Sequence, residues 1–520
     1  MKRTTLLLLA AAFLCTAPRM QLRAQTHAVI PTADQVGAAC MPDTIAPISA
    51  PFDMPQLTRP VFPAYTLTLT KRELKKAPLA SLVIQRAIDQ VNGRGGGTVI
   101  VPEGVWHTGR IVLKSNVNLH LAEGAELHFS GRVEDYLPVV FTRSAGVEGM
   151  SLGAFIYAHG QRNIALTGKG RLVGPDRDCD ILRQNIGYGD FDQYIDYDRP
   201  ATERIYDGHD STAVFLPTFI GPVDCRNVLI EGVSLEKSVF WNIVPTYCDS
   251  VIIRGVTVNS VGIPTGDGMD IESCRNVLIE YNTLATGDDC FTIKAGRGID
   301  GLRVGRPTEN VVLRYNLALT GHGGITCGSE TAGMIRDVYA HDCVFRGTTV
   351  GLRFKTRRPR GGGGEHLYYE RIRMDLGATA IHFDMLGSSA YVGALSGRVP
   401  MKRDEFTPVY RDVCIRDIIV ERASCFLKVA GIPESPARDV RISRVDATAD
   451  KLLLISDMDG LMLEDAVLRS PDGTLRITDG RNLRLRRVTF CTPSGTVSRH
   501  IEGPLSENIR FTDCRYEPLP

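Results

Sequence analysis

The chain has 520 residues, of which 43% are hydrophobic and 23% charged, and its formal net charge is +1. This composition supplies enough apolar surface for a large core and excludes an intrinsically disordered protein. A charge this close to zero also argues against a protein that binds nucleic acid.

The first 24 residues predict a secretory signal peptide. Two basic residues precede the apolar run Leu6–Leu14, and a small-residue exit follows near Ala24. The run is too short to span a bilayer, and no later segment reaches about 18 uninterrupted apolar residues, so we expect no membrane span. Because no small residues immediately precede Cys15, we expect export to the periplasm or the exterior rather than a lipid anchor. Losing the signal's four basic residues lowers the formal net charge to −3.

Residues 25–75 are expected to form an N-terminal extension, and residues 76–520 a single large domain. Near the start of that domain, Leu79–Val91 is amphipathic and is followed by Asn92 and Gly93. Apolar residues at helical spacing that end in Asn-Gly predict a short helix. We expect this helix to cap the open N-terminal end of the strands that follow.

A short phrase recurs from residue 163 onward: Asn or Asp, an alternating apolar strand, then a polar turn. Most intervals between its copies are 21 to 34 residues, and clear copies are NIALTGKG at 163, NVLIEGVSL at 227, NVLIEYNTL at 276 and NLRLRRVTF at 482. A strand-rich repeat of this length stacks into a parallel β-helix, whereas propeller blades need about 40 residues or more. We therefore predict an all-β, single-stranded parallel β-helix.

Three cysteines recur with the same spacing as this repeat. Cys225, Cys248 and Cys274 each lie two residues before the start of a copy. Stacked coils lie about 4.8 Å apart with parallel Cβ directions, which suits a column of buried free thiols better than disulfides. No Cys-x-x-Cys pair or histidine cluster has metal-ligand spacing. We therefore predict neither a metal site nor a cofactor.

Aligning the strand that follows each turn separates inward from outward positions. The inward columns are apolar: Ile243, Met269, Phe291, Ile325 and Leu352, and then Pro245, Ile271, Ile293, Cys327 and Phe354. The outward columns and the turns before them bring ionisable residues to one face: Asp267, Asp270, Asp288, Asp289, Lys294, His322, Arg353 and Lys355.

Each of these ionisable residues also has a structural interpretation. Aspartates in turns bond to nearby backbone, and Glu272 with Lys294 is an ordinary cross-strand ion pair. Their convergence favours a functional role, because stacked carboxylates repel one another at a cost in stability. Clustered carboxylates without a nucleophilic thiol or serine–histidine pair suit general acid–base chemistry, and glycoside hydrolysis fits best. The flanking basic residues indicate a substrate that carries carboxylates, such as a uronic-acid polysaccharide.

The segment from Phe240 to Arg358 resembles glycoside hydrolase family 28, the polygalacturonase family, and in particular its bacterial exo-acting members. The matching phrases stand in the family's order: FWNIVPTYC, GDGMDIESCRNVLIE, TGDDCFTIKAG, GHGGITCGSE and GLRFKTRR. KSNVNLHLAEGAELHFS at 114 and FIYAHGQRNIALTGKG at 155 extend the resemblance over most of the chain. It implies a right-handed parallel β-helix and metal-free, inverting hydrolysis of α-linked galacturonic acid in pectin.

The resemblance also implies roles for individual residues. Asp288 matches the general acid, Asp267 with Asp289 match the pair that positions and deprotonates water, and His322 matches the histidine beside the acid. Inversion requires acid and base carboxyls about 6.5–9.5 Å apart, a spacing that neighbouring columns can supply. The predicted substrate-binding residues are Arg353, Lys355, Lys294 and Asp270. The first two match the pair that grips the sugar carboxylate.

The chain departs from the family pattern where Thr265 replaces an asparagine and Val244 replaces a histidine, so the substrate is less well defined than the reaction. The insert Gly296–Thr308 resembles the loop that walls off the groove in exo-acting members, and residues 357–365 are expected to add a second, mobile basic wall. Three interpretations of the acidic insert Asp176–Asp210 are open: it lines a far subsite, it binds an ion, or it packs on the coils. We expect it to pack on the coils.

Three alternatives stay open. The first alternative, within the family, is a rhamnogalacturonan hydrolase or another hydrolase of pectin side chains. Outside it, a pectate lyase also uses a parallel β-helix, but with calcium and a basic proton abstractor. The third alternative is a non-catalytic β-helix that binds carbohydrate. No oligomeric state is predicted.

Overall fold

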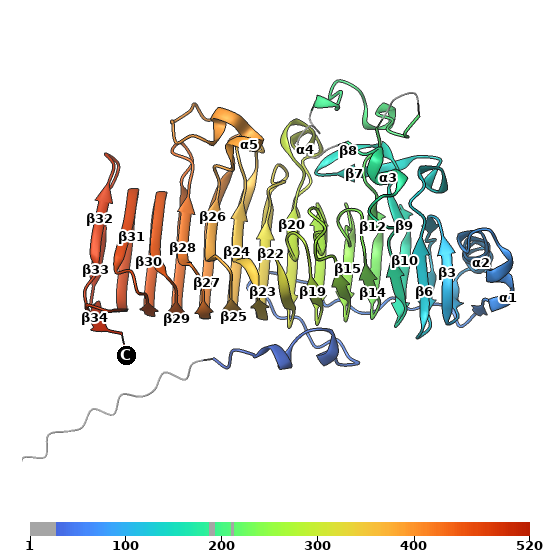
Figure 1. Cartoon of the computed structure of the whole chain (residues 1–520), viewed down its shortest axis with the longest axis horizontal. Coiled ribbons are helices and arrows are strands. Elements are labelled where there is room, and N and C mark those ends of the chain that lie inside the picture. Colours follow the sequence, from blue (N-terminus) through green and yellow to red (C-terminus); the bar gives the residue numbers. More distant parts are fainter. Residues whose placement is uncertain (1–27, 187–192, 210–212, 520) are drawn as a thin grey trace, which may run out of the picture.

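The computed structural model describes residues 28–186, 193–209 and 213–519. The predicted signal peptide lies outside these residues. The described chain is all-β apart from short helices, and its strands pair in parallel into an elongated stack of coils, a parallel β-helix (Figure 1). Among its strands only β7 (Val140–Ser144) and β8 (Val147–Ser151) pair antiparallel. No helix among the described residues is both long and apolar enough to cross a membrane.

Each coil contributes up to three strands, which stack on those of the next coil into sheets that we call A, B and C. Sheet A contains β2 (Gly97–Val101), β5 (Val117–Leu121), β10 (Arg162–Gly168), β13 (Arg226–Glu231), β15 (Asp249–Arg254), β18 (Arg275–Glu280), β21 (Thr308–Arg314) and β33 (Arg510–Thr512). Sheet B contains β3 (Gly104–Thr108), β6 (Ala125–Phe129), β11 (Arg171–Val173), β14 (Ser234–Glu236), β16 (Thr257–Asn259), β19 (Thr283–Ala285) and β34 (Arg515–Pro518).

Sheet C carries the candidate site. It contains β4 (Ile111–Val112), β9 (Ala154–His159), β12 (Thr218–Val223), β17 (Met269–Glu272), β20 (Phe291–Lys294), β24 (Thr348–Lys355), β26 (Thr379–Asp384), β28 (Cys425–Ala430) and β32 (Ser498–Glu502). The longer strands pass from one sheet into the next: β22 (Leu317–Cys327), β23 (Ile335–Arg346), β25 (Gly363–Asp375), β27 (Val409–Arg422), β29 (Ala437–Thr448), β30 (Lys451–Arg469) and β31 (Thr474–Thr492).

The repeated phrase marks a special backbone conformation between sheet C and the next strand of sheet A. The residue that opens it has a positive φ: 51° at Asn163, 61° at Asn227, 57° at Asn276 and 56° at Asn310. Residues other than Gly, Asn and Asp are disfavoured in this left-handed region, which explains why Asn or Asp opens most copies. The amides also bond along the column, and Asn227 Nδ2 donates to Asn163 Oδ1 at 2.6 Å.

The strand register of sheet C confirms the inward columns. The residues that pair in succession are Met269, Phe291, Ile325 and Leu352 in one column and Ile271, Ile293, Cys327 and Phe354 in the other. All eight side chains are buried. Removing this apolar surface from water on every coil stabilises the stack.

The cysteine column is also confirmed. Cys225, Cys248 and Cys274 are buried, and all twelve cysteines of the described chain are free. The Sγ of Cys248 donates to Pro222 O at 3.3 Å, one coil earlier. Burial raises the pKa of the Cys248 thiol well above its ordinary value, so the thiol stays protonated and unreactive.

The predicted capping helix is α2 (Ser81–Gly93), which follows α1 (Lys71–Lys76). Its apolar face, with Ile84 and Ile88 fully buried, packs against β2, β4 and β5. Upstream, β1 (Thr66–Thr68) pairs in parallel with β2. The first coil is therefore covered rather than left as an open edge.

Residues 28–62, which we call the strap, lie along the outer face of sheet A. Two of its apolar side chains are buried against outward residues of successive coils: Ala165, Leu229, Ile252, Leu278, Val312 and Tyr339. Arginines of the coils donate hydrogen bonds to its backbone. Arg373 Nε donates to Pro31 O at 3.0 Å, and Arg254 Nη2 donates to Pro42 O at 2.7 Å. The strap also contains the 3-10 turns Ala33–Gln35 and Ala38–Cys40.

Insertions flank sheet C on both sides and stand along one edge of the stack in Figure 1. Those before its strands carry η3 (Val133–Tyr136), β7, β8, α3 (Asp180–Arg183) and η5 (Ala201–Glu203), and those after them carry α4 (Gly298–Val304), α5 (Ser389–Val392) and η6 (Gly393–Ser396). Within the acidic insert Asp176–Asp210, the described residues Ile186 and Ile195 pack with Val147 and Phe215. The expected packing is confirmed for this part of the insert.

Candidate active site

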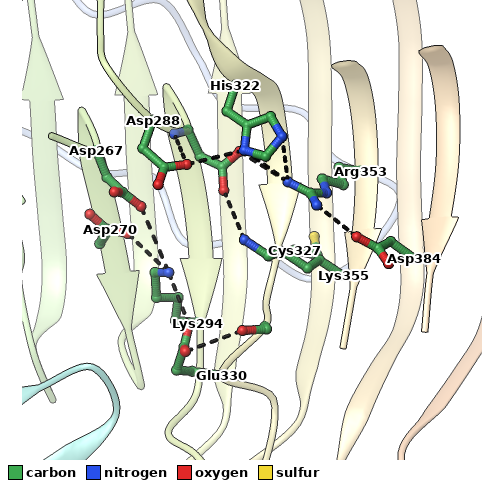
Figure 2. Close-up of polar contacts among 12 residues, drawn as sticks. Asp267, Asp270, Asp288, Lys294, His322, Cys327, Glu330, Arg353, Lys355 and Asp384 are labelled. Carbon is green, nitrogen blue, oxygen red and sulfur yellow. Dashed lines mark hydrogen bonds and ion pairs between the residues drawn. The ribbon is translucent and has the colours of Figure 1, made fainter. Parts of the chain in front are cut away.

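The predicted ionisable residues come together on the outer face of sheet C (Figure 2). Asp267 lies just before β17, and Asp288 and Asp289 lie just before β20. His322 lies in β22 and Arg353 in β24. Because β17, β20, β22 and β24 pair in succession, four adjacent coils deliver these side chains to one surface.

Asp288 and His322 form the exposed part of the cluster. Their side chains are 28% and 43% exposed, and His322 Nδ1 lies 3.4 Å from Asp288 Oδ1. One oxygen of Asp288, one of Asp289 and a ring nitrogen of His322 all lie within 4.8 Å of one another. These atoms are of the kind that bind metal ions, but exposed acidic groups commonly lie this close without one.

Asp288 and Asp289 lie close together, and one oxygen of each comes within 4.8 Å of the other. The spacing of about 6.5–9.5 Å that inversion requires was expected between neighbouring columns on adjacent coils, and it stays a prediction. Adjacent positions of one turn are closer than positions on adjacent coils, and Asp289 N donates to Asp288 Oδ1 at 2.9 Å.

Asp289 is the carboxylate that the site keeps ionised. Burial by itself would raise its pKa, but the charges of Lys355 and Arg353 outweigh burial and lower the pKa to about 2. Lys355 Nζ lies 3.6 Å from Asp289 Oδ2, and Arg353 Nη1 lies 3.9 Å from its Oδ1. A carboxylate held in this way accepts a proton only transiently.

Asp267 has the opposite electrostatic environment. Burial and the negative charges of Asp270 and Asp288 raise the pKa of Asp267 well above its ordinary value, against the pull of Lys294. Asp267 and Asp289, predicted as an equivalent pair, therefore differ in protonation. Environments that push two carboxyl pKa values apart are typical of acid–base sites.

The predictions that Asp270 and Lys294 bind substrate are wrong for this structure. The carboxylate of Asp270 is fully buried, and Lys294 is 3% exposed. Lys294 Nζ lies 3.5 Å from Asp270 and 4.3 Å from the centre of the Trp241 ring, and it donates to Glu330 Oε2 at 3.0 Å. Both side chains point outward from the coil, but neighbouring coils and loops cover them. They therefore affect the pKa of Asp267 rather than contact substrate.

Glu330 is a residue that the sequence analysis missed. It is fully buried, and burial would raise its pKa, but Lys294 and Arg360 lower the pKa well below its ordinary value. Glu330 follows the strand β22 within the quoted phrase GHGGITCGSE. Nothing in the alternation predicts its partners, because it lies beyond the aligned strand.

Asp384 is a second missed residue. Arg353 Nη2 donates to Asp384 Oδ2 at 2.6 Å, and its Nη1 lies 3.2 Å from His322 Nδ1 (Figure 2). Asp384 lies in β26, opposite Lys355 in the register. Extending the outward column that contains Lys355 by one coil would have identified Asp384. Asp384 therefore holds the guanidinium of Arg353 beside His322.

The insert Gly296–Thr308 contains α4, and hydrogen bonds to its Asp300 hold it in place. Asp300 is buried, and Arg204 Nη1 donates to its Oδ1 at 3.0 Å. The backbone N of Glu148 in β8 donates to its Oδ2 at 2.8 Å. The acidic insert, the β7–β8 hairpin and α4 thus form one packed wall beside the site.

The expectation of a mobile wall at residues 357–365 is wrong. Arg357, Arg358 and Arg360 are all more than 90% buried. Arg358 Nε and Nη2 donate to the two carboxylate oxygens of Glu434 at 2.6 and 2.7 Å. A bidentate pair of this kind fixes a segment rather than leaving it free.

The chain is similar to several known proteins. Residues 207–388 match the model of glycosyl hydrolases family 28. A probable polygalacturonase of Vitis vinifera is 27% identical over 366 residues, which are 69% of this chain and 68% of that protein. The exo-poly-alpha-D-galacturonosidase of Dickeya chrysanthemi is 26% identical over 375 residues, 65% of this chain and 60% of that protein. The crystal structure of a hyperthermoactive exopolygalacturonase from Thermotoga maritima superposes with a TM-score of 0.70 at 29% identity, covering 79% and 93% of the two chains.

Clustered carboxylates beside basic residues on a parallel β-helix suit acid–base hydrolysis of a glycosidic bond, and the family match and the similar polygalacturonases indicate a glycosidase. Over residues 207–388 the chain is similar to glycosyl hydrolases family 28, and the similar proteins named above are polygalacturonases. The chain spans 60% of the length of the Dickeya relative, so the activity, substrate and partners of this chain are taken up as proposals.

Proposed function

We propose that the chain is an exported hydrolase that releases α-linked galacturonic acid residues from the ends of pectin chains. The observation that carries the proposal is the meeting of Asp288, Asp289 and His322 on the outer face of sheet C, next to the basic pair Arg353 and Lys355. An acid, an ionised base and a carboxylate-binding pair are the groups that hydrolysis of a uronide needs. The names of the relatives, two of them exo-acting on polygalacturonate, support the same substrate.

In the proposed mechanism, Asp288 donates its proton to the glycosidic oxygen as the bond from the anomeric carbon to that oxygen breaks. A water molecule attacks the anomeric carbon from the opposite face and gives its proton to Asp289. The leaving sugar departs as an alcohol, and the released sugar has inverted configuration. Exchange of protons with solvent then restores both carboxyls.

Arg353 and Lys355 serve two purposes in this scheme. Their charges keep Asp289 ionised, and their donors face the groove where a sugar carboxylate binds. Substrate carboxylate and Asp289 therefore share the same two cations. We infer that substrate binding weakens their hold on Asp289 and makes it a better proton acceptor.

Exo action, export and the hand of the helix are parts of the same proposal. The packed wall of α4, with Asp300 tied to Arg204 at 3.0 Å, supports attack from a chain end because it stands beside the site as a fixed barrier. A right-handed coil is supported by the strong preference of parallel strand connections for that hand. Export is supported by the signal-like first 24 residues.

Product analysis with a panel of pectic oligosaccharides tests the proposal. Oligogalacturonides should lose one short, constant unit from an end, and proton NMR should show the inverted anomer first. An early ladder of mid-sized products would contradict exo action, and cleavage of rhamnogalacturonan alone would place the chain with that alternative.

The same reactions separate the other classes. An unsaturated, ultraviolet-absorbing product that disappears with chelator would indicate a pectate lyase. Binding without any product would indicate a carbohydrate binder. We expect neither result, and we expect the rate to be unchanged by chelator.

A further inference from the structure

The carboxyl of Asp267 has no hydrogen-bond donor among the described residues. Its ion pair with Lys294 has an N–O distance of 3.9 Å, which is too long for a hydrogen bond. Of residues 261–265, which lead into Asp267, only Ile263 is buried. The direction of this carboxyl is therefore set by how the backbone of residue 267 is held.

The backbone carbonyl of Asp267 is held by one residue of the preceding coil. Asn242 donates to it twice, from its backbone N at 3.0 Å and from its side-chain Nδ2 at 2.9 Å. Asn242 is itself fixed to the coil before it, since Ile220 N in β12 donates to Asn242 O at 2.9 Å. The amide of Asn242 thus connects the ordered strands of sheet C to the turn that carries Asp267.

The same turn is also bonded to the following coil. Gly268 N donates to Asp289 O at 2.9 Å. A Cβ at residue 268 would lie 2.5 Å from Cys290 O, so the two coils approach closely here. The bonds from Asn242 therefore fix Asp267 relative to Asp289 as well as to the coil before it.

The side chain of Asn242 is costly to bury. The residue is fully buried, and its Oδ1 has no hydrogen-bond partner among the described residues; an unpaired buried acceptor lowers stability. An apolar side chain of similar size would avoid this cost, and Asp267 O would keep its bond from the backbone N of residue 242. Packing therefore does not explain the asparagine. A local rule that is broken beside an active site is typical of a functional residue.

We propose that Asn242 is a positioning residue, which holds Asp267 where its carboxyl shares the attacking water with Asp289. The inference rests on the proposed function, because this water has a role only in hydrolysis. A group that orients a reacting water must be placed accurately, and a displacement of about 1 Å lowers a rate about 100-fold. Asn242 is fully buried, so it acts through the backbone of Asp267 and not on substrate.

Asn242→Leu separates positioning from structural support. We expect kcat on oligogalacturonides to fall about 10- to 100-fold. KM should stay nearly unchanged, because the attacking water is engaged in the transition state rather than in substrate binding. The melting temperature should stay the same or rise, since the unpaired oxygen is removed. An unchanged kcat, with or without a lower melting temperature, would overturn the proposal.

Asn282→Leu is the matched control. Asn282 is also fully buried, but it lies between β18 and β19, away from sheet C. Its amide is bonded on both sides: Oδ1 accepts from Val256 N at 2.9 Å, and Nδ2 donates to Ile253 O at 3.1 Å. Loss of these bonds should lower the melting temperature and leave kcat unchanged below the transition. If kcat of this control fell as far as that of Asn242→Leu, loosening of the coils would explain both results and the proposal would be overturned.

Asn242→Asp tests the hydrogen-bond donor while keeping the shape of the side chain. A protonated carboxyl at this position can donate to Asp267 O, whereas an ionised one cannot. Across a pH profile, this variant should keep more kcat than Asn242→Leu at acid pH and lose the advantage as the pH rises. Equal kcat of the two variants at every pH would overturn the proposal and leave the proposed function standing. A wild type that cleaves no oligogalacturonide would overturn both.

Discussion

Replacing Lys294 by Met removes an ammonium group that forms ion pairs with three buried carboxyls. Its Nζ lies 3.0 Å from Glu330, 3.5 Å from Asp270 and 3.9 Å from Asp267, and all four side chains are at most 5% exposed. Methionine keeps most of the length and the packing on Trp241. The substitution therefore tests charge compensation with little change in volume.

The expected cost follows from the burial of the pairs. Removing one partner of a buried ion pair destabilises a protein by about 3–5 kcal/mol, because the other charge stays buried. Lys294 lowers the pKa of Glu330 against burial, which raises it, so the wild type keeps this stabilisation until the pH falls through the lowered pKa. Without Lys294, burial raises the pKa of Glu330, and protonation then relieves the unpaired charge of the variant at a higher pH. The difference between wild type and variant should therefore be largest near pH 8 and shrink toward pH 4.

Guanidinium denaturation followed by circular dichroism at pH 8, 6 and 4 measures this difference. Lys428→Met, at an exposed position of the same sheet, is the matched control and should change stability little at any pH. A Lys294→Met protein as stable as wild type at pH 8 would refute the compensation argument. So would a loss of stability that stays constant with pH.

Three further predictions concern the acid, the basic pair and the thiols. Asp288→Asn should lower kcat about 10²- to 10⁴-fold with little change in KM or in thermal stability, as expected when a general acid is lost; unchanged turnover of oligogalacturonides would exclude the assigned role. Asp384→Asn should release Arg353 from its 2.6 Å pair and lower kcat/KM about 10-fold or more, mainly through KM; a kcat effect alone, measured in the same kinetics, would argue against a role in binding. Thiol titration of the chain without its signal should give twelve free thiols in denaturant and far fewer in the native protein, since Cys248 and its neighbours are buried; a count near zero in denaturant would show disulfides instead.

The coil architecture could be predicted because one physical constraint recurs in every repeat. A backbone position with φ near 55° favours Asn, Asp or Gly, and an inward position favours an apolar side chain. Asn276 and Asn310 show the first requirement, and Phe291 and Ile325 show the second. These two requirements fix the register of one coil on the next. The register in turn predicts that Asp288 and His322 lie close together.

Burial of the outward residues could not be predicted in the same way. Alternation tells which side of the coil Asp270 and Lys294 face, but whether water reaches them depends on loops from other coils. Asp384 was missed because the alignment ended one coil too early, and Glu330 because it lies past the end of its strand. Their partners are long-range contacts that local pattern does not encode.

The strap gives the chain an order of assembly. Pro31 is bonded to Arg373, 342 residues further along, so the first described part of the molecule has no surface to dock on until the middle coils exist. Contacts of such large sequence separation form slowly, because the loop between them must close first. The coils have to stack beforehand, with the apolar outer stripe of sheet A still open to solvent. The strap precedes the coils in the chain, but its first described residues dock only after the coil that carries Arg373 has formed.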